Sequence, residues 1–133
     1  MSFAKSFHRP DLGYLLLRIL VGGLMFNHGL QNLIAGVETW EMLGSVMANF
    51  GITVYPSLFG LVCVVIQTFG GLFFLLGLFF RPVCMLLTLV MLLAVCFHLM
   101  SGHEFPQAEL AAVFTILFTA FTFMGPGRYS VDK

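Results

Sequence analysis

Charge is what this sequence has least of. Asp, Glu, Lys and Arg make up 9% of its 133 residues, whereas they make up about a quarter of an ordinary soluble domain. The formal net charge of zero, together with 59% hydrophobic residues, excludes intrinsic disorder, which needs low hydrophobicity and high net charge. The chain has no excess of basic residues, so its charge does not indicate a nucleic acid as a partner. A lipid bilayer is therefore the expected environment, and residues 1–133 are expected to form a single transmembrane domain.

Cysteine is scarce as well. Cys63, Cys84 and Cys96 all lie in apolar runs, and their spacing fits neither a redox motif nor a metal site. Cys84 and Cys96 are separated by roughly 18 Å along one expected helix, which is too far for a disulfide. Cys63 and Cys96 on neighbouring helices leave a redox pair open, but the pattern favours inert buried thiols.

Motifs for most kinds of chemistry are missing too. No haem, flavin or iron–sulfur motif is present, so the chain is not expected to store electrons by itself. No glycine-rich loop follows a strand, and there is no G-x-S-x-G element, which excludes phosphate-cradling loops and the hydrolase nucleophile. His98, His103, Glu104 and Glu109 match no metal-ligand spacing, so no metal site is predicted.

Long apolar runs are what the sequence does have. Because backbone groups in lipid must be bonded within their own segment, such runs predict helices that cross the bilayer. Arg81-Pro82 predicts the break between the second and third helices, because proline and its predecessor disfavour helix. The expected architecture is an all-α membrane protein, a four-transmembrane-helix bundle. Its expected helices run from about Leu12 to Ile34, Leu58 to Phe80, Val83 to Met100 and Ala108 to Met124.

The first outer loop also has a helical pattern. Between residues 35 and 56, Val37, Trp40, Leu43 and Met47 recur near helical spacing. Trp favours the membrane–water interface, where its ring is apolar while its N–H stays hydrated. The loop is therefore expected to form a short amphipathic interfacial helix that covers the outer mouth of the bundle.

Basic residues are confined to one side of the expected topology. They fall near the N-terminus, between the second and third helices, and in the C-terminal tail, and are Lys5, Arg9, Arg18, Arg81, Arg128 and Lys133. The other side carries only acidic charge, at Glu38, Glu41, Glu104 and Glu109. Because cytoplasmic loops are enriched in Lys and Arg, both termini are predicted to be cytoplasmic.

Polar side chains inside the apolar runs are the candidate site. Asn27, His28 and Gln31 share one side of the first helix. The other members, one on each later helix, are Gln67, His98 and Glu109. Their positions converge on the outer half of the bundle, where imidazole suits proton exchange with a bound ligand. The alternative is that these groups only hydrogen-bond between helices. Packing is favoured for Gln31 and Gln67 taken alone, whereas for His28 the two interpretations are balanced.

Arg18 lies about two helical turns inside the first apolar run, where an isolated charge is costly. Its long side chain can extend to the cytoplasmic headgroups. Alternatively it turns inward and binds an anion or a quinone carbonyl. The sequence leaves both orientations open.

Three stretches carry a resemblance to a known family. They are Arg18 with Phe26-Asn27-His28-Gly29-Leu30-Gln31, Gly70-Gly71-Leu72-Phe73-Phe74-Leu75-Leu76-Gly77-Leu78 with Arg81, and Gly125-Pro126-Gly127-Arg128-Tyr129-Ser130-Val131-Asp132. In these the chain resembles the DoxX family of small four-helix membrane proteins. The resemblance implies a bacterial inner-membrane protein, and the family is named after a subunit associated with quinone-linked oxidation of sulfur compounds. Relatives often carry a glutamate where this chain has Gln67, and a basic residue where it has Gln31 or Asn32.

The leading hypothesis is a quinone-interacting membrane subunit of an oxidoreductase, whose redox centre belongs to a partner subunit. His28 and Arg18 are its candidate catalytic residues, and Asn27, Gln31, Gln67, His98 and Glu109 its candidate ligand-binding residues. A non-enzymatic membrane scaffold or accessory protein is the alternative, and association into a homo-oligomer is left open. A small-molecule carrier ranks third, because the inner half of the bundle is apolar apart from Arg18.

Overall fold

The computed structural model describes residues 9–102 and 104–132, and within these ranges every regular element is helical. The elements are α2 (Pro10–Ala35), α3 (Val37–Gly44), the 3-10 helix η1 (Ser45–Phe50), α4 (Pro56–Leu76), α5 (Phe80–Met100) and α6 (Phe105–Met124). Among these, α2, α4 and α5 are long and apolar enough to cross a membrane, whereas the apolar stretch of α6 is shorter, Ala108–Met124. The prediction of an all-α membrane protein is confirmed, and a fourth span stays a prediction.

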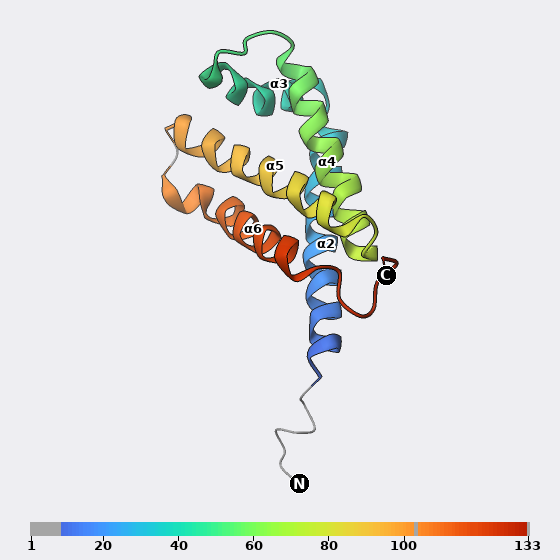
Figure 1. Cartoon of the computed structure of the whole chain (residues 1–133). Coiled ribbons are helices and arrows are strands. Elements are labelled where there is room, and N and C mark those ends of the chain that lie inside the picture. The colour runs from blue at the N-terminus through green and yellow to red at the C-terminus, as the bar shows by residue number, and fades with distance from the viewer. Residues whose placement is uncertain (1–8, 103, 133) are drawn as a thin grey trace.

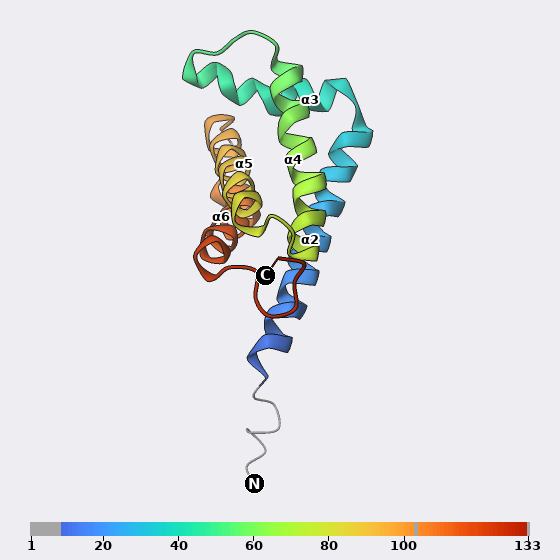
Figure 2. The same ribbon diagram turned by 45° about the vertical axis from the view of Figure 1, so that its right-hand side comes forward.

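The long helices form two antiparallel pairs (Figure 1). α2 packs along α4, and α5 packs along α6, while α4 also contacts α5. α3 and η1 cross over the ends of α4 and α5 (Figure 2), where α3 contacts α4 and η1 contacts both helices. A helix therefore exists where the interfacial helix was expected, and its position at a membrane surface stays a prediction.

Glycines allow α2 and α4 to approach at backbone distance. A methyl group at Gly29 of α2 would lie 2.5 Å from the backbone nitrogen of Thr68, and one at Gly71 of α4 would lie 2.6 Å from that of Phe26. At Gly23, by contrast, a methyl group would meet no neighbouring helix within 4 Å. Small residues at a helix–helix interface are the usual means of close packing in membranes. The close contact of α2 with α4 therefore depends on the glycines that face the neighbouring helix, such as Gly29 and Gly71, and not on Gly23.

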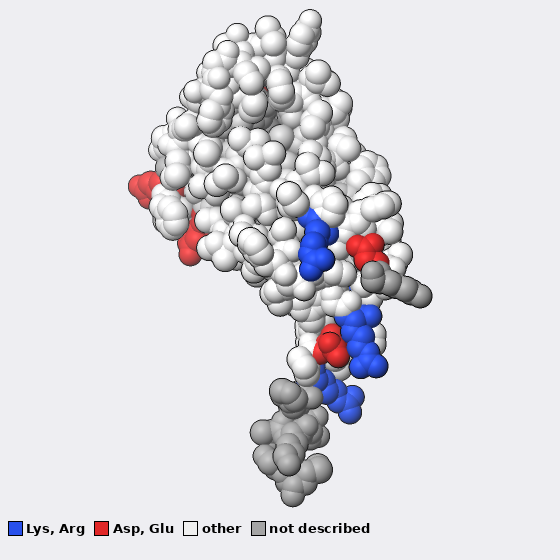
Figure 3. Space-filling model, viewed as in Figure 1, with Lys and Arg blue, Asp and Glu red and all other residues white. Residues whose placement is uncertain are grey.

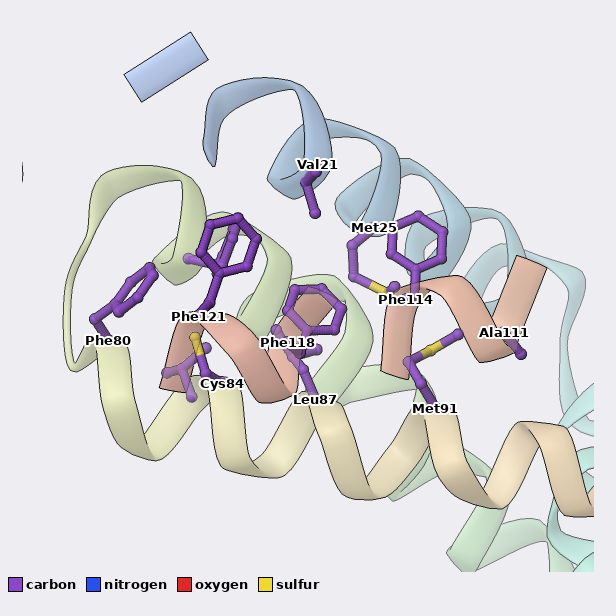
Figure 4. Packing of buried hydrophobic residues seen from close by; sticks show 12 residues of the cluster. Val21, Met25, Phe80, Cys84, Leu87, Met91, Ala111, Phe114, Phe118 and Phe121 are labelled. Atoms are coloured by element: carbon purple, nitrogen blue, oxygen red, sulfur yellow. The ribbon is translucent and has the colours of Figure 1, made fainter. Parts of the chain in front are cut away.

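Aromatic rings hold the two pairs together near the turn from α4 to α5. Phe74 of α4 packs against Phe80 of α5 and Phe121 of α6, with ring centroids 5.1 and 4.9 Å apart. In Figure 4, Val21 and Met25 of α2 point toward the phenylalanines of α6. These residues are buried, and such aromatic contacts add to the apolar area that they bury. The pairs are therefore joined most firmly at this end.

The break between α4 and α5 falls at Gly77–Phe79, earlier than the Arg81-Pro82 break that was predicted. Gly77 has φ of +73°, a left-handed conformation that glycine adopts readily, and it ends α4. Pro82 then lies in the first turn of α5. A proline is tolerated there because N–H groups of a first turn have no partner within the helix.

The C-terminal tail closes this end of the bundle. Asp132 accepts hydrogen bonds from the backbone N–H groups of Phe79 and Phe80, at 3.0 and 2.8 Å, which caps the start of α5. The tail also donates to α4, from the Val131 N–H to the Leu76 carbonyl at 3.1 Å. It thereby supplies partners for backbone groups at the end of one helix and the start of the next.

Replacing Asp132 with alanine is expected to lower the free energy of unfolding by about 2 kcal/mol, because two backbone N–H groups lose a charged acceptor. Thermal unfolding of the detergent-solubilised protein measures the loss. Asp11→Ala is the control, because Asp11 makes only an exposed ion pair with Arg128 at 3.7 Å, which contributes little. Equal effects of the two substitutions would contradict the capping role of Asp132.

Candidate functional site

A cleft of about 280 Å³ lies between α2, α5 and α6 and borders the buried core at Met91, Ala111 and Phe114. We call it the His28 cleft. It is lined by Leu24, Asn27, His28, Gln31, Met91, Ala94, His98, Leu110, Ala111 and Phe114. On each helix these residues are neighbours or lie three or four positions apart, so each helix contributes one stripe of its surface.

The polar part of the lining combines two imidazoles with two amides. His28, Asn27 and Gln31 come from α2, and His98 comes from α5. Within α2, the Gln31 amide nitrogen donates to Asn27 Oδ1 at 3.5 Å, and His28 Nε2 lies 3.5 Å from the amide nitrogen of Asn32. These distances are at the limit of a hydrogen bond. The α2 side chains can therefore exchange such contacts for stronger ones to a ligand.

The sequence matches a known family over the helices that form most of this cleft. The model of the DoxX family matches residues 13–100, more than half of the chain. The chain belongs to the DoxX family. The matched DoxX range includes the four polar residues of the His28 cleft, and α6 and the tail lie beyond it. No curated protein and no solved structure matches the chain.

Gln67 and Glu109, which were expected to join the cluster, do not line the His28 cleft of this DoxX chain. Gln67 is buried on α4, where its amide nitrogen contacts Met91 Sδ at 3.9 Å. Glu109 is exposed on α6, one residue before the cleft residue Leu110. Periodicity alone missed this separation, because it gives no indication of how each helix is rotated about its axis.

Arg18 lies outside the His28 cleft and is only 3% exposed. Its Nε donates to the Leu75 carbonyl at 3.1 Å, and its Nη1 donates to the Pro126 carbonyl at 2.8 Å. Tyr14, one turn earlier, donates its hydroxyl to the Gly125 carbonyl. The guanidinium thus points inward, to protein carbonyls rather than to headgroups, and joins α2 to the end of α4 and to the tail. A ligand-binding role of Arg18 stays a prediction.

Within residues 9–102 and 104–132, no three His, Cys, Asp or Glu side chains gather as a metal ion would require. His103, which belonged to the metal alternative, lies outside the described residues. Cys63, Cys84 and Cys96 are free thiols in the structure. The imidazoles and amides of the His28 cleft can form hydrogen bonds, and its imidazoles can also transfer protons.

Proposed function

We propose that this DoxX-family protein binds a quinone ring in the His28 cleft, as the membrane subunit of an oxidoreductase. The observation that carries the proposal is one cleft with polar groups from α2 and α5 and apolar walls from α2, α5 and α6. A quinone ring needs polar groups to hydrogen-bond its oxygens and apolar walls to pack against its faces. The redox centre that exchanges electrons with the ring belongs to a partner subunit.

The size and chemistry of the cleft fit such a ring. Small-molecule pockets span about 300–1,000 Å³, so a cleft of about 280 Å³ suits one ring and leaves an isoprenoid tail in the lipid. Amide and imidazole N–H groups of Gln31, His28 and His98 can donate to ring carbonyls. When bound, the quinone supplies reversible two-electron, two-proton chemistry. The imidazoles of His28 and His98 can hold or release a proton at one of their own nitrogens, which neutral amides cannot do.

The proposal includes four membrane spans, with α6 as the fourth and both termini in the cytoplasm of a bacterial cell. Figure 3 shows that the basic groups visible on this face gather toward the N-terminal end. The tail lies at the same end, because Arg128 pairs with Asp11, and Asp132 bonds to Phe80. Basic residues mark the cytoplasmic side, so the His28 cleft opens in the outer half and α3 lies at the outer interface.

The test is thermal stability of the purified protein with ubiquinone and menaquinone analogues. A ligand present at a hundred times its Kd stabilises the native state by about 2.7 kcal/mol. We expect a quinone-dependent rise in Tm for the wild type, absent in His28→Ala. Asn49→Ala, which removes an amide of η1 outside the cleft, should retain the rise.

The absence of a rise with every quinone, in a protein that unfolds cooperatively, would contradict the proposal. The scaffold alternative would then apply, and cross-linking in membranes would identify the partner. Uptake of a bound compound into proteoliposomes would instead indicate the carrier.

A further inference from the structure

Gln67 carries a buried polar atom that has no hydrogen-bond partner in the described part of the fold. The side chain is 5% exposed, and among the described residues its Oε1 is the buried side-chain oxygen without a hydrogen-bond partner. Its Nε2 has only the thioether of Met91, at 3.9 Å, which is a weak acceptor. Because an unpaired buried acceptor destabilises a fold, Oε1 implies an occupant that donates a hydrogen bond to it.

Gln67 lies at the same level of the bundle as His28. A methyl group at Gly29, the neighbour of His28, would lie 2.8 Å from the backbone carbonyl carbon of Gln67. On its other side Gln67 contacts Met91, which lines the His28 cleft. α4 packs against both α2 and α5, so Gln67 lies where α4 meets the two helices that bear the polar groups of the cleft.

A second, smaller cavity of about 30 Å³ contains Gln67 and lies between α4, α5 and the α3–η1 segment. We call it the Gln67 cavity. Ala94 of α5 lines both this cavity and the His28 cleft. Met91, which contacts Gln67 and also lines the cleft, stands beside Ala94. These two side chains are the partition between the two spaces.

The partition is suited to move. Figure 4 shows Met91 on the face of α5 that looks toward Ala111 and Phe114 of α6. A methionine side chain has three rotatable bonds and no branch, so it repacks easily. Ala94 contributes only a methyl group. A change of the Met91 rotamer would therefore expose the Gln67 amide to a molecule in the His28 cleft.

We propose that Gln67 is the deep anchor of the ligand in the His28 cleft, reached when Met91 moves aside. This inference rests on the proposed function and narrows its ligand class. The ligand is a ring with two oxygens on opposite sides, one held by the α2 and α5 polar groups and the other by Gln67. The amide donates from Nε2 to a ring carbonyl and accepts at Oε1 from a ring hydroxyl, so it serves the oxidised and the reduced ring without titrating.

The experiment compares two ring compounds of equal alkyl substitution, a para-dihydroxybenzene and the corresponding monohydroxybenzene, by calorimetric titration of the detergent-solubilised protein. The wild type should bind the dihydroxy compound about tenfold more tightly, the worth of one hydrogen bond to a buried acceptor. Gln67→Met, of similar shape, should bind both compounds equally. Cys63→Ala, which alters the same cavity without touching the amide, should keep the preference.

A second variant tests the partition without removing the amide. Met91→Ile is branched at Cβ and stiff at χ1, so it should lose the preference for the dihydroxy compound and still bind the monohydroxy one. A tenfold preference retained in both Gln67→Met and Met91→Ile would overturn this inference alone, and Oε1 would then be satisfied by a water molecule in the Gln67 cavity. Failure of the wild type to bind either ring would overturn the proposed function together with it.

Discussion

Replacing Gly29 with alanine is expected to lower the free energy of unfolding by about 3 kcal/mol, the upper end of what overpacking a core costs. The added methyl group would lie 2.5 Å from the backbone nitrogen of Thr68 and 2.6 Å from its hydroxyl. A flexible side chain could move away from such a contact, but a helix backbone cannot. α2 and α4 must therefore separate along their length, and His28, the neighbour of Gly29, would shift with them.

Gly23→Ala is the matched control on the same helix. The new methyl group would meet no neighbouring helix within 4 Å, and alanine favours helix over glycine by about 1 kcal/mol. Thermal or denaturant unfolding in detergent should therefore show a loss for Gly29→Ala and no loss for Gly23→Ala. Equal stability of the two variants would mean that α2 and α4 do not approach as the structure has them.

Replacing Arg18 with methionine is expected to cost about 4 kcal/mol, because two hydrogen bonds from a charged donor disappear and their partly buried carbonyl acceptors lose that donor. The lost partners are Leu75 and Pro126, so the end of α4 and the tail would each lose a bond to α2, and the tail would be held to α2 by Tyr14 at the Gly125 carbonyl. Arg18→Lys should lose about half as much, since an ammonium lacks the planar fork that reaches two acceptors at once.

Thermal unfolding measures this loss, and limited proteolysis of the tail shows whether the tail is released. Arg128→Met is the control, because Arg128 is exposed and its ion pair with Asp11 is a surface contact, worth about 1 kcal/mol or less. At a temperature where Arg18→Met remains folded, quinone binding can be measured without the effect of the lost stability. Quinone binding retained there would assign Arg18 to the fold, whereas binding lost in a fully folded variant would restore its predicted role at the ligand.

Much of the candidate site was predictable from the α2 and α5 sequences. His28, Asn27 and Gln31 fall on one stripe of α2 because residues three and four apart share a helix face, and His98 faces them across the cleft. Depth along a helix follows directly from residue number, since each residue adds a fixed rise. Rotation about the helix axis does not follow, because α4 and α5 are apolar on nearly every side and their pattern marks no unique face. For this reason the sequence placed Gln67 in the outer half of the bundle with His28 but gave no indication that it contacts Met91 outside the cleft.

By itself the sequence determined the membrane class, the helical fold, the membership in the DoxX family and the approximate extent of each long helix. The family membership rests on sequence motifs and the match to residues 13–100. The other properties depend on composition and on the length of apolar runs, which lipid converts into helices wherever they occur. Only the tertiary structure decided that Asp132 caps α5 and that Arg18 bonds to the tail. These contacts join residues more than fifty positions apart in the chain, and the path that brings them together is a property of the packed bundle rather than of any one segment.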